Sequence, residues 1–145
     1  MYLAAGTWNI DVVDGKVKNL LANFTEVTTT GINPHTHTIT NYKPTNGNNN
    51  NSNRVVLTDN NDLKIYGYVD VLRNGQPVKN WVNVPVKIFM SKGNIVSIDV
   101  DPIKTNYHFG GIPVFGIVTL LTDQNNKSIR AHSSIITPNN ATNTS

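Results

Sequence analysis

Apolar side chains recur at every second position along most of this 145-residue chain, and a period of two predicts β-strands. Ile65, Val69 and Val71 share one parity, for example, while polar or aromatic residues fill the positions between them. Asn74-Gly75 then separates this run from a second alternating run, and that dipeptide favours a tight hairpin because both residues tolerate positive φ. We find no stretch with the 3.6-residue period of an amphipathic helix, so the chain is predicted to be all-β.

Turn signals divide the chain into short strands with hairpin-length connections, which is typical of an antiparallel β-sandwich or a small β-barrel of about eight or nine strands. Periodicity leaves both architectures open. Residues 112–122 form the most apolar stretch and are predicted to be a central strand. The full set of predicted strands is 8–12, 17–28, 35–42, 54–58, 63–71, 82–90, 95–100, 112–122 and 128–137.

The length suits one domain. We expect a single all-β domain over residues 1–137. Within it, the low-complexity segment 43–53 contains a run of asparagines and is predicted to be a surface loop. Residues 138–145 are predicted to be a disordered polar tail.

Composition excludes several functions. The chain has no cysteine, so disulfides, thiolate metal sites and cysteine nucleophiles are ruled out. Its net charge of +3 is spread along the sequence without a basic run, which argues against nucleic acid as a partner. No apolar run approaches the roughly 20 residues of a membrane span. The oligomeric state stays open.

An extracytoplasmic location, secreted or at the cell surface, is our expectation. Charged residues make up only 14% of the chain, and asparagine and threonine are abundant. Residues 1–6 are too short for a signal peptide, so we expect that peptide to lie outside this sequence. Glycosylation sequons, some of which such a composition produces by chance, begin at Asn23, Asn50, Asn126, Asn140 and Asn143.

His35 and His37 are the residues that most clearly suggest chemistry. Alternate residues of a strand project from the same face, so two imidazoles spaced in this way can reach one ion. His108, which precedes Phe109 and a Gly-Gly pair, is the third candidate ligand. Three imidazoles with an open fourth position suit a catalytic zinc ion, and imidazole also binds copper. His132 falls on the opposite parity to its apolar neighbours and is expected to face water.

A His-x-His pair also arises by chance and can be purely structural. Glu26, the only glutamate, shares the parity of Leu20, Ala22 and Phe24, which would turn it inward. There it is a candidate metal ligand, outer partner of a metal-bound histidine, or general base. A bulge near Asn23 would place it in solvent instead, and the sequence slightly favours that alternative.

Two further groupings are weaker. Tyr66 and Tyr68 share a face, and Trp81 on the paired strand could complete an aromatic platform for sugar, although simple cross-strand packing is favoured. Asp99 and Asp101 have the spacing of paired carboxylates, but Pro102 follows at once and indicates a solvated strand end.

Three motifs resemble a group of small secreted proteins from ammonia-oxidising archaea. They are residues 8–12 (WNIDV), 35–42 (HTHTITNY) and 108–116 (HFGGIPVFG), within a resemblance that spans most of residues 6–122. It implies a cell-envelope setting in copper-dependent organisms and draws attention to His35, His37 and His108 together. It brings no reaction with it.

The sequence therefore predicts an extracytoplasmic metal-binding β-domain with one zinc or copper ion on His35, His37 and His108. In one version the protein is a zinc-dependent hydratase or hydrolase whose site resembles that of carbonic anhydrases, with a small-molecule substrate. In another it handles copper without catalysis. The alternative is a structural or adhesive cell-surface module in which the histidines are incidental.

Overall fold

The computed structural model describes residues 2–45, 54–123 and 125–128. These residues contain no helix, and therefore none that could cross a membrane. The strands are β1 Tyr2–Val13, β2 Lys16–Thr28, β3 His35–Pro44, β4 Leu63–Arg73, β5 Gln76–Pro77, β6 Val84–Ser91, β7 Ile95–Val100 and β8 Val114–Ile117.

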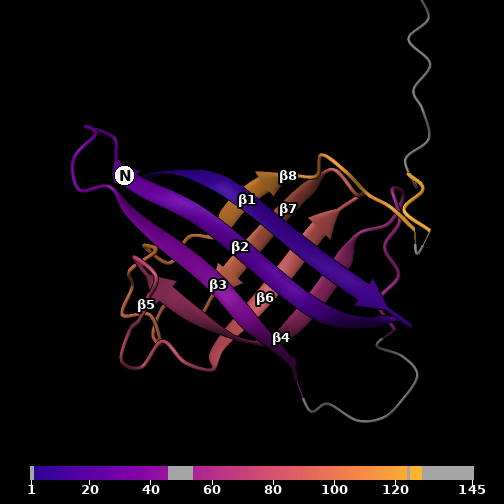
Figure 1. Ribbon diagram of the computed structural model, residues 1–145, viewed down its shortest axis with the longest axis horizontal. Coiled ribbons are helices and arrows are strands. Elements are labelled where there is room, and N and C mark those ends of the chain that lie inside the picture. The colour runs from indigo at the N-terminus through magenta and orange to yellow at the C-terminus, as the bar shows by residue number, and fades with distance from the viewer. Residues whose placement is uncertain (1, 46–53, 124, 129–145) are drawn as a thin grey trace, which may run out of the picture.

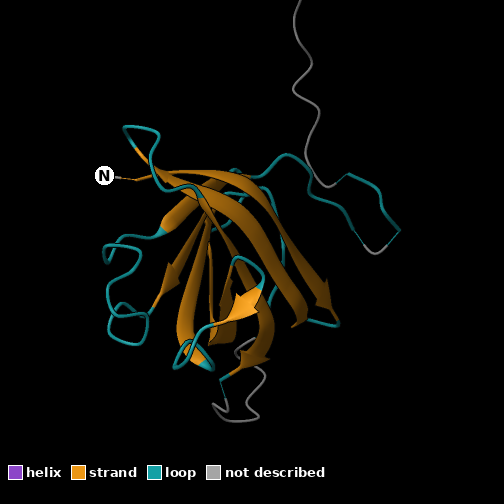
Figure 2. Cartoon of the chain, turned by 60° about the vertical axis from the view of Figure 1, so that its left-hand side comes forward, coloured by secondary structure: helices purple, strands orange, loops and turns teal. Residues whose placement is uncertain are grey.

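All strands belong to one antiparallel sheet with the order β1-β2-β3-β4-β6-β7-β8, and the short β5 pairs with β4. The sheet coils until it is nearly closed, so that β1, β2 and β3 cross in front of β6, β7 and β8 (Figure 1). Seen from the side, the strands curve around a common interior (Figure 2). The predicted all-β class of about eight strands is confirmed, in its barrel-like form.

The interior is filled by the inward parity of each strand, as the alternation predicts. Along β4, buried residues 65, 67, 69 and 71 alternate with more exposed neighbours. Strand pairing is regular along most of the sheet and shifts register between Asp11 and Val12 and between Thr40 and Lys43. The core consists of Leu20, Ala22, Phe24, Ile39, Ile65, Val69, Val71, Trp81, Val84, Val86, Ile88, Val96, Ile98 and Val100.

The predicted tight turn at Asn74-Gly75 is present, and a second tight turn follows β1. Asp14 and Gly15 join β1 to β2 with φ of 52° and 76°, and Asn74 and Gly75 join β4 to β5 with φ of 51° and 72°. The Asn74-Gly75 turn also contacts β3, because the Asn74 side chain accepts a hydrogen bond from the Thr36 amide. This contact fixes the strand segment that carries the histidine pair.

Two strand predictions are wrong. Residues 54–58 form no strand, although the Val55 amide donates to the carbonyl of Gly15. Residues 112–122 form only the short β8, which ends the path of paired strands instead of lying at its centre. The apolar residues of this stretch are largely on the outside: Phe115 is 67% exposed and Ile117 71%. Hydrophobicity alone does not distinguish such an edge from a buried strand.

Three predictions fall partly or wholly outside the described residues. They are the Asn-rich loop, of which residues 46–53 are not described and 43–44 belong to β3, the last strand beyond Ser128, and the tail 138–145.

Candidate metal centre

The candidate site lies where β2 ends and β3 begins. Glu26 pairs with His35 across these two strands, and Phe24 pairs with His37, with no shift of register along the pairing. The regular pairing keeps Glu26 on the inward parity, where it is 6% exposed. The bulge that would have placed Glu26 in solvent is therefore absent from β2, and the prediction that slightly favoured it is wrong.

His108 reaches the same point from a turn-rich segment between β7 and β8. Thr105 anchors this segment: it is fully buried, its hydroxyl donates to the Asp101 carbonyl, and its own carbonyl accepts from the His108 amide at 3.0 Å. Asn106 and Tyr107 adopt positive φ immediately before the histidine. The backbone at His108 is thus set by local turns and not by a strand.

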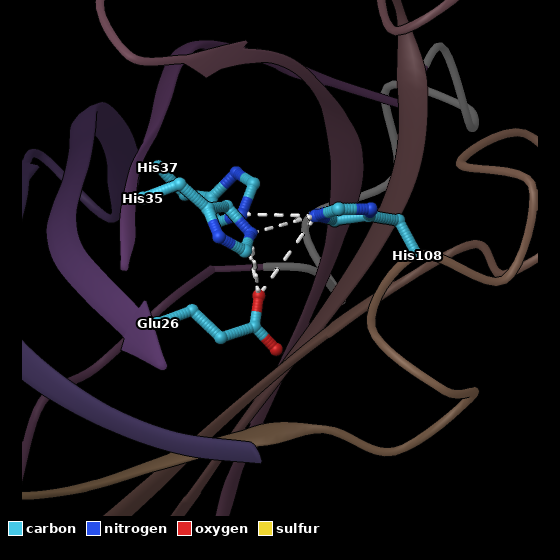
Figure 3. A group of neighbouring side chains, drawn as sticks. All are labelled: Glu26, His35, His37 and His108. Atoms are coloured by element: carbon cyan, nitrogen blue, oxygen red, sulfur yellow. Dashed lines mark hydrogen bonds and ion pairs between the residues drawn. The ribbon is translucent and has the colours of Figure 1, made fainter. Parts of the chain in front are cut away.

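Four ligand atoms converge at the centre of this cluster (Figure 3). Nε2 of His108 lies 3.2 Å from Nε2 of His35 and 3.1 Å from Nε2 of His37. Oε2 of Glu26 lies 3.6 Å from Nε2 of His35, 3.2 Å from that of His37 and 3.9 Å from that of His108. All four atoms lie within 4.8 Å of one another.

These distances are close to those between the ligands of a tetrahedral zinc ion. With zinc–nitrogen and zinc–oxygen distances of about 2.0–2.1 Å, neighbouring ligand atoms are about 3.3–3.4 Å apart. Five of the six separations, at 3.1–3.9 Å, bracket that value, and the sixth, between His35 and His37, is within 4.8 Å. The cluster could therefore hold one metal ion without large movement of its side chains.

Hydrogen bonding fixes the orientation of His35. Its Nδ1 lies 2.9 Å from the carbonyl oxygen of Asn33. A carbonyl can only accept, so Nδ1 carries the proton, and in the neutral ring Nε2 then presents a lone pair to the centre. Asn33 itself adopts φ of 54°, which places its carbonyl just before the strand. Metal-binding histidines usually have such a partner on the ring nitrogen that does not bind the metal.

Two buried polar atoms of the cluster have no hydrogen-bond partner among the described residues: Oε2 of Glu26, and Nδ1 of His37, which is not the nitrogen that faces the other ligand atoms. The carbonyl of Leu72 lies close enough to favour the protonated form of His37, yet no hydrogen bond of regular geometry reaches Nδ1. Buried polar atoms are seldom left in this state. Three imidazole nitrogens and a carboxylate oxygen together supply many lone pairs and few protons, which suits a bound cation.

Burial also shifts the ionisation of the cluster towards its neutral forms. Burial, and to a smaller extent the neighbouring His108 and His35, lower the pKa of His37 to about 4. Burial likewise lowers the pKa of His108 and raises that of Glu26. At neutral pH these two imidazoles are therefore uncharged and able to donate a lone pair to a metal.

Aromatic rings surround the histidines. The centroid of the His37 ring lies 5.4 Å from that of Phe24 and 5.0 Å from that of Phe109, and Trp81 lies 4.9 Å from His108. These apolar rings shield the cluster from water. The His108 side chain is 22% exposed, against 8% or less for the other three, so solvent reaches the centre past His108.

The structure thus brings together His35, His37 and His108, as the sequence predicts, and adds Glu26 at ligand distance. Sequence reasoning missed the role of Trp81, which is buried beside the histidines and not on the surface with Tyr66 and Tyr68. The three residues therefore do not form an aromatic platform.

The remaining candidates lie apart from this cluster or cannot be placed. Oδ1 of Asp101 accepts from the Lys104 amide within a turn, which satisfies that carboxylate locally. His132 lies outside the described residues.

No family model, curated protein or solved structure matches this chain. What the site can do must therefore be argued from its own geometry.

Proposed function

We propose that this protein binds one Zn²⁺ ion through Glu26, His35, His37 and His108. The observation that carries the proposal is the convergence of three Nε2 atoms and one carboxylate oxygen at separations of 3.1–3.9 Å, in a buried setting. Chance clustering of four surface groups would leave them solvated and mutually farther apart. Here Oε2 of Glu26 has given up water without gaining a hydrogen bond, which costs free energy unless a cation binds there.

Zinc fits this set better than copper(II). Oε2 of Glu26 and Nε2 of His108 each lie 3.1–3.6 Å from Nε2 of both His35 and His37. These separations are nearer the edge of a tetrahedral zinc site, about 3.3 Å, than the roughly 2.8 Å between adjacent ligands of the square-planar arrangement that copper(II) favours. Imidazole and carboxylate are both ordinary zinc ligands. Copper binding is the main competing outcome, because three imidazoles bind copper strongly whatever the preferred geometry.

Whether Glu26 binds the ion determines whether the site is structural or catalytic. Its Oε2 lies 3.2 Å from Nε2 of His37, which is a ligand-to-ligand distance. With Glu26 as the fourth ligand the zinc ion is saturated by protein atoms, and closed four-coordinate sites are typical of structural zinc. Under this proposal the ion ties the end of β2, the start of β3 and the segment around His108 together.

A zinc titration of metal-stripped protein, with a chromophoric chelator as competitor, tests the proposal. We expect one equivalent to bind to the wild type and none to His37→Ala at the same chelator strength. Thr36→Ala is the matched control, because Thr36 lies between the two histidines on the exposed face of β3. Equal zinc binding by the wild type and His37→Ala would reject the site.

Hydration or hydrolysis of a small molecule is a second candidate, favoured by one observation. Glu26 lies farthest from His108, at 3.9 Å, and His108 is also where solvent reaches the cluster. A carboxylate that leaves the metal on this side would open a position for water and could accept its proton. Carbon dioxide hydration and ester hydrolysis by the zinc-loaded protein test this candidate, and rates equal to those of the His37→Ala protein would exclude it.

A further inference from the structure

The barrel is open along one side. Among the described residues no backbone pairing joins β1 to β8, the two strands that end the path β1-β2-β3-β4-β6-β7-β8. A long strand with one free edge presents unpaired N–H and C=O groups, which folded proteins usually cover. β1 has such an edge along Tyr2–Val13.

Strand direction shows what kind of segment would close the gap. Every neighbouring pair on this path is antiparallel, so direction alternates from strand to strand. The path contains seven strands, and β1 and β8 therefore run in the same direction. One additional strand, antiparallel to both edges, would complete an even-numbered barrel in which every pairing is antiparallel.

A groove of about 1040 Å³ lies between the two edges. Residues 4–11 of β1 line one side, and residues 114–122 line the other. Trp8 and Gly116 meet across it, because a Cβ atom added to Gly116 would lie 2.8 Å from Nε1 of Trp8. The seam is thus held by side-chain contact at this level and not by a backbone ladder.

The described part of the chain ends beside this groove, after a turn that reverses its direction. Thr122 and Ser128 form an antiparallel bridge, and Thr122 lines the groove. The turn between them is closed by hydrogen bonds from the Lys127 amide to Oδ1 of Asp123 and from the Asp123 amide to the Lys127 carbonyl. At Ser128 the chain therefore runs antiparallel to the segment that leads out of β8.

We propose that residues 129–137 of this same chain bind in the groove as the strand that closes the barrel. At about 3.3 Å per residue they reach about 30 Å, enough to follow residues 4–11 of β1. Their sequence, IRAHSSIIT, contains three isoleucines and a threonine, which favour strands, and Pro138 then ends the run. Continuing the Thr122–Ser128 pairing brings residues 133 and 134 to the level of Gly116, and hence of Trp8.

Disulfide trapping in the full chain tests this proposal, because the natural sequence contains no cysteine. Thr7→Cys on β1 is combined in turn with Ser133→Cys, Ser134→Cys and Thr142→Cys. Adjacent residues of paired strands have Cα separations that a disulfide spans, whereas Thr142 lies beyond Pro138 and serves as the matched control. We expect the 133 or the 134 pair to form a disulfide within one chain in most molecules, and the 142 pair in few.

Three results would overturn the proposal. Disulfides between chains would show that a second copy supplies the strand, equal trapping at all three positions would show unspecific contact, and absence of trapping at 133 and 134 would show an empty groove. As a second measurement, Ser134→Pro should increase the exchange rate of the β1 edge amides about tenfold, whereas Asn139→Pro should not. Equal exchange in the two variants would also count against the proposal.

Discussion

Nε2 of His37 lies 3.2 Å from Oε2 of Glu26, and neither side chain is exposed to solvent beyond 8%. The two groups are at ion-pair distance, yet burial lowers the pKa of the histidine and raises that of the glutamate. In the metal-free protein burial thus favours the neutral form of each group. Attraction between opposite charges therefore contributes little free energy to this contact. A cation between them would remove the conflict, and the following predictions depend on this relationship.

Glu26→Gln should weaken zinc binding by about 100-fold or more, since loss of even an outer partner of a metal ligand costs about 10–100-fold. The same substitution should leave the metal-free protein as stable as the wild type or more stable, because it removes a buried carboxylate. Competition titration and denaturation in EDTA measure the two effects, with the exposed neighbour Thr25→Ser as control. Unchanged zinc affinity would mean that Glu26 is not a ligand.

Zinc should stabilise the fold. An ion that binds only the native state adds about 2.7 kcal/mol at a free concentration 100 times its Kd. For a chain of this length that corresponds to a rise in Tm of roughly 5–10 °C. Calorimetry with zinc and with EDTA measures the difference. His37→Ala should show no zinc-dependent change in Tm, and a change as large as that of the wild type would contradict the site.

Acidification should destabilise the metal-free protein through His37. The unfolded imidazole gains a proton near pH 6.5, whereas the folded one stays neutral until about pH 4. Within this window the unfolded state binds more protons, so the free energy of unfolding falls as pH falls, by about 1–3 kcal/mol.

Glu26 acts in the opposite direction, because its raised folded pKa means that the folded state gains stability as pH falls. The measurement therefore belongs in the Glu26→Gln background, where this opposing carboxylate is absent. Denaturant titrations between pH 7 and 4 should show the decline in Glu26→Gln protein, and His37→Gln added to this background should flatten it. A decline that is equally steep in both variants would assign the effect to other groups.

Position 33 should influence the metal through its backbone alone. The Asn33 carbonyl accepts from Nδ1 of His35 while the residue adopts φ of 54°, which glycine tolerates and valine does not. We expect Asn33→Gly to keep zinc affinity within a few-fold and Asn33→Val to lower it about tenfold or more. Equal affinities in the two variants would show that this hydrogen bond does not orient the ligand.

Much of this structure could be predicted from local pattern. Alternation along β2 and β4 identifies their inward faces, and the Asn74-Gly75 turn is read directly from its two residues. The spacing of His35 and His37 likewise places both rings on one face. These features depend on the period of a strand and on the φ that a residue tolerates, and both are properties of short segments.

The remaining features depend on long-range contacts, which period and turn signals do not encode. Glu26 is separated from His108 by most of the chain, and only the pairing of β2 with β3 shows that the carboxylate turns inward at ligand distance. The burial of Trp81 against His108 is also a long-range contact, and it depends on a loop conformation that no sequence pattern specifies. The edge position of β8 was missed for a related reason: apolar composition is similar in a buried strand and in one beside a groove.

Elemental analysis by inductively coupled plasma mass spectrometry, on protein purified without a His tag or chelator, shows whether the four side chains bind a metal. We expect about one zinc ion per chain in the wild type and its loss in His37→Ala, with Thr36→Ala unchanged. Copper at the same stoichiometry would keep the site and change the metal. Wild-type protein that contains no transition metal, and takes up none when zinc or copper is supplied at micromolar concentration, would rule out the metal site.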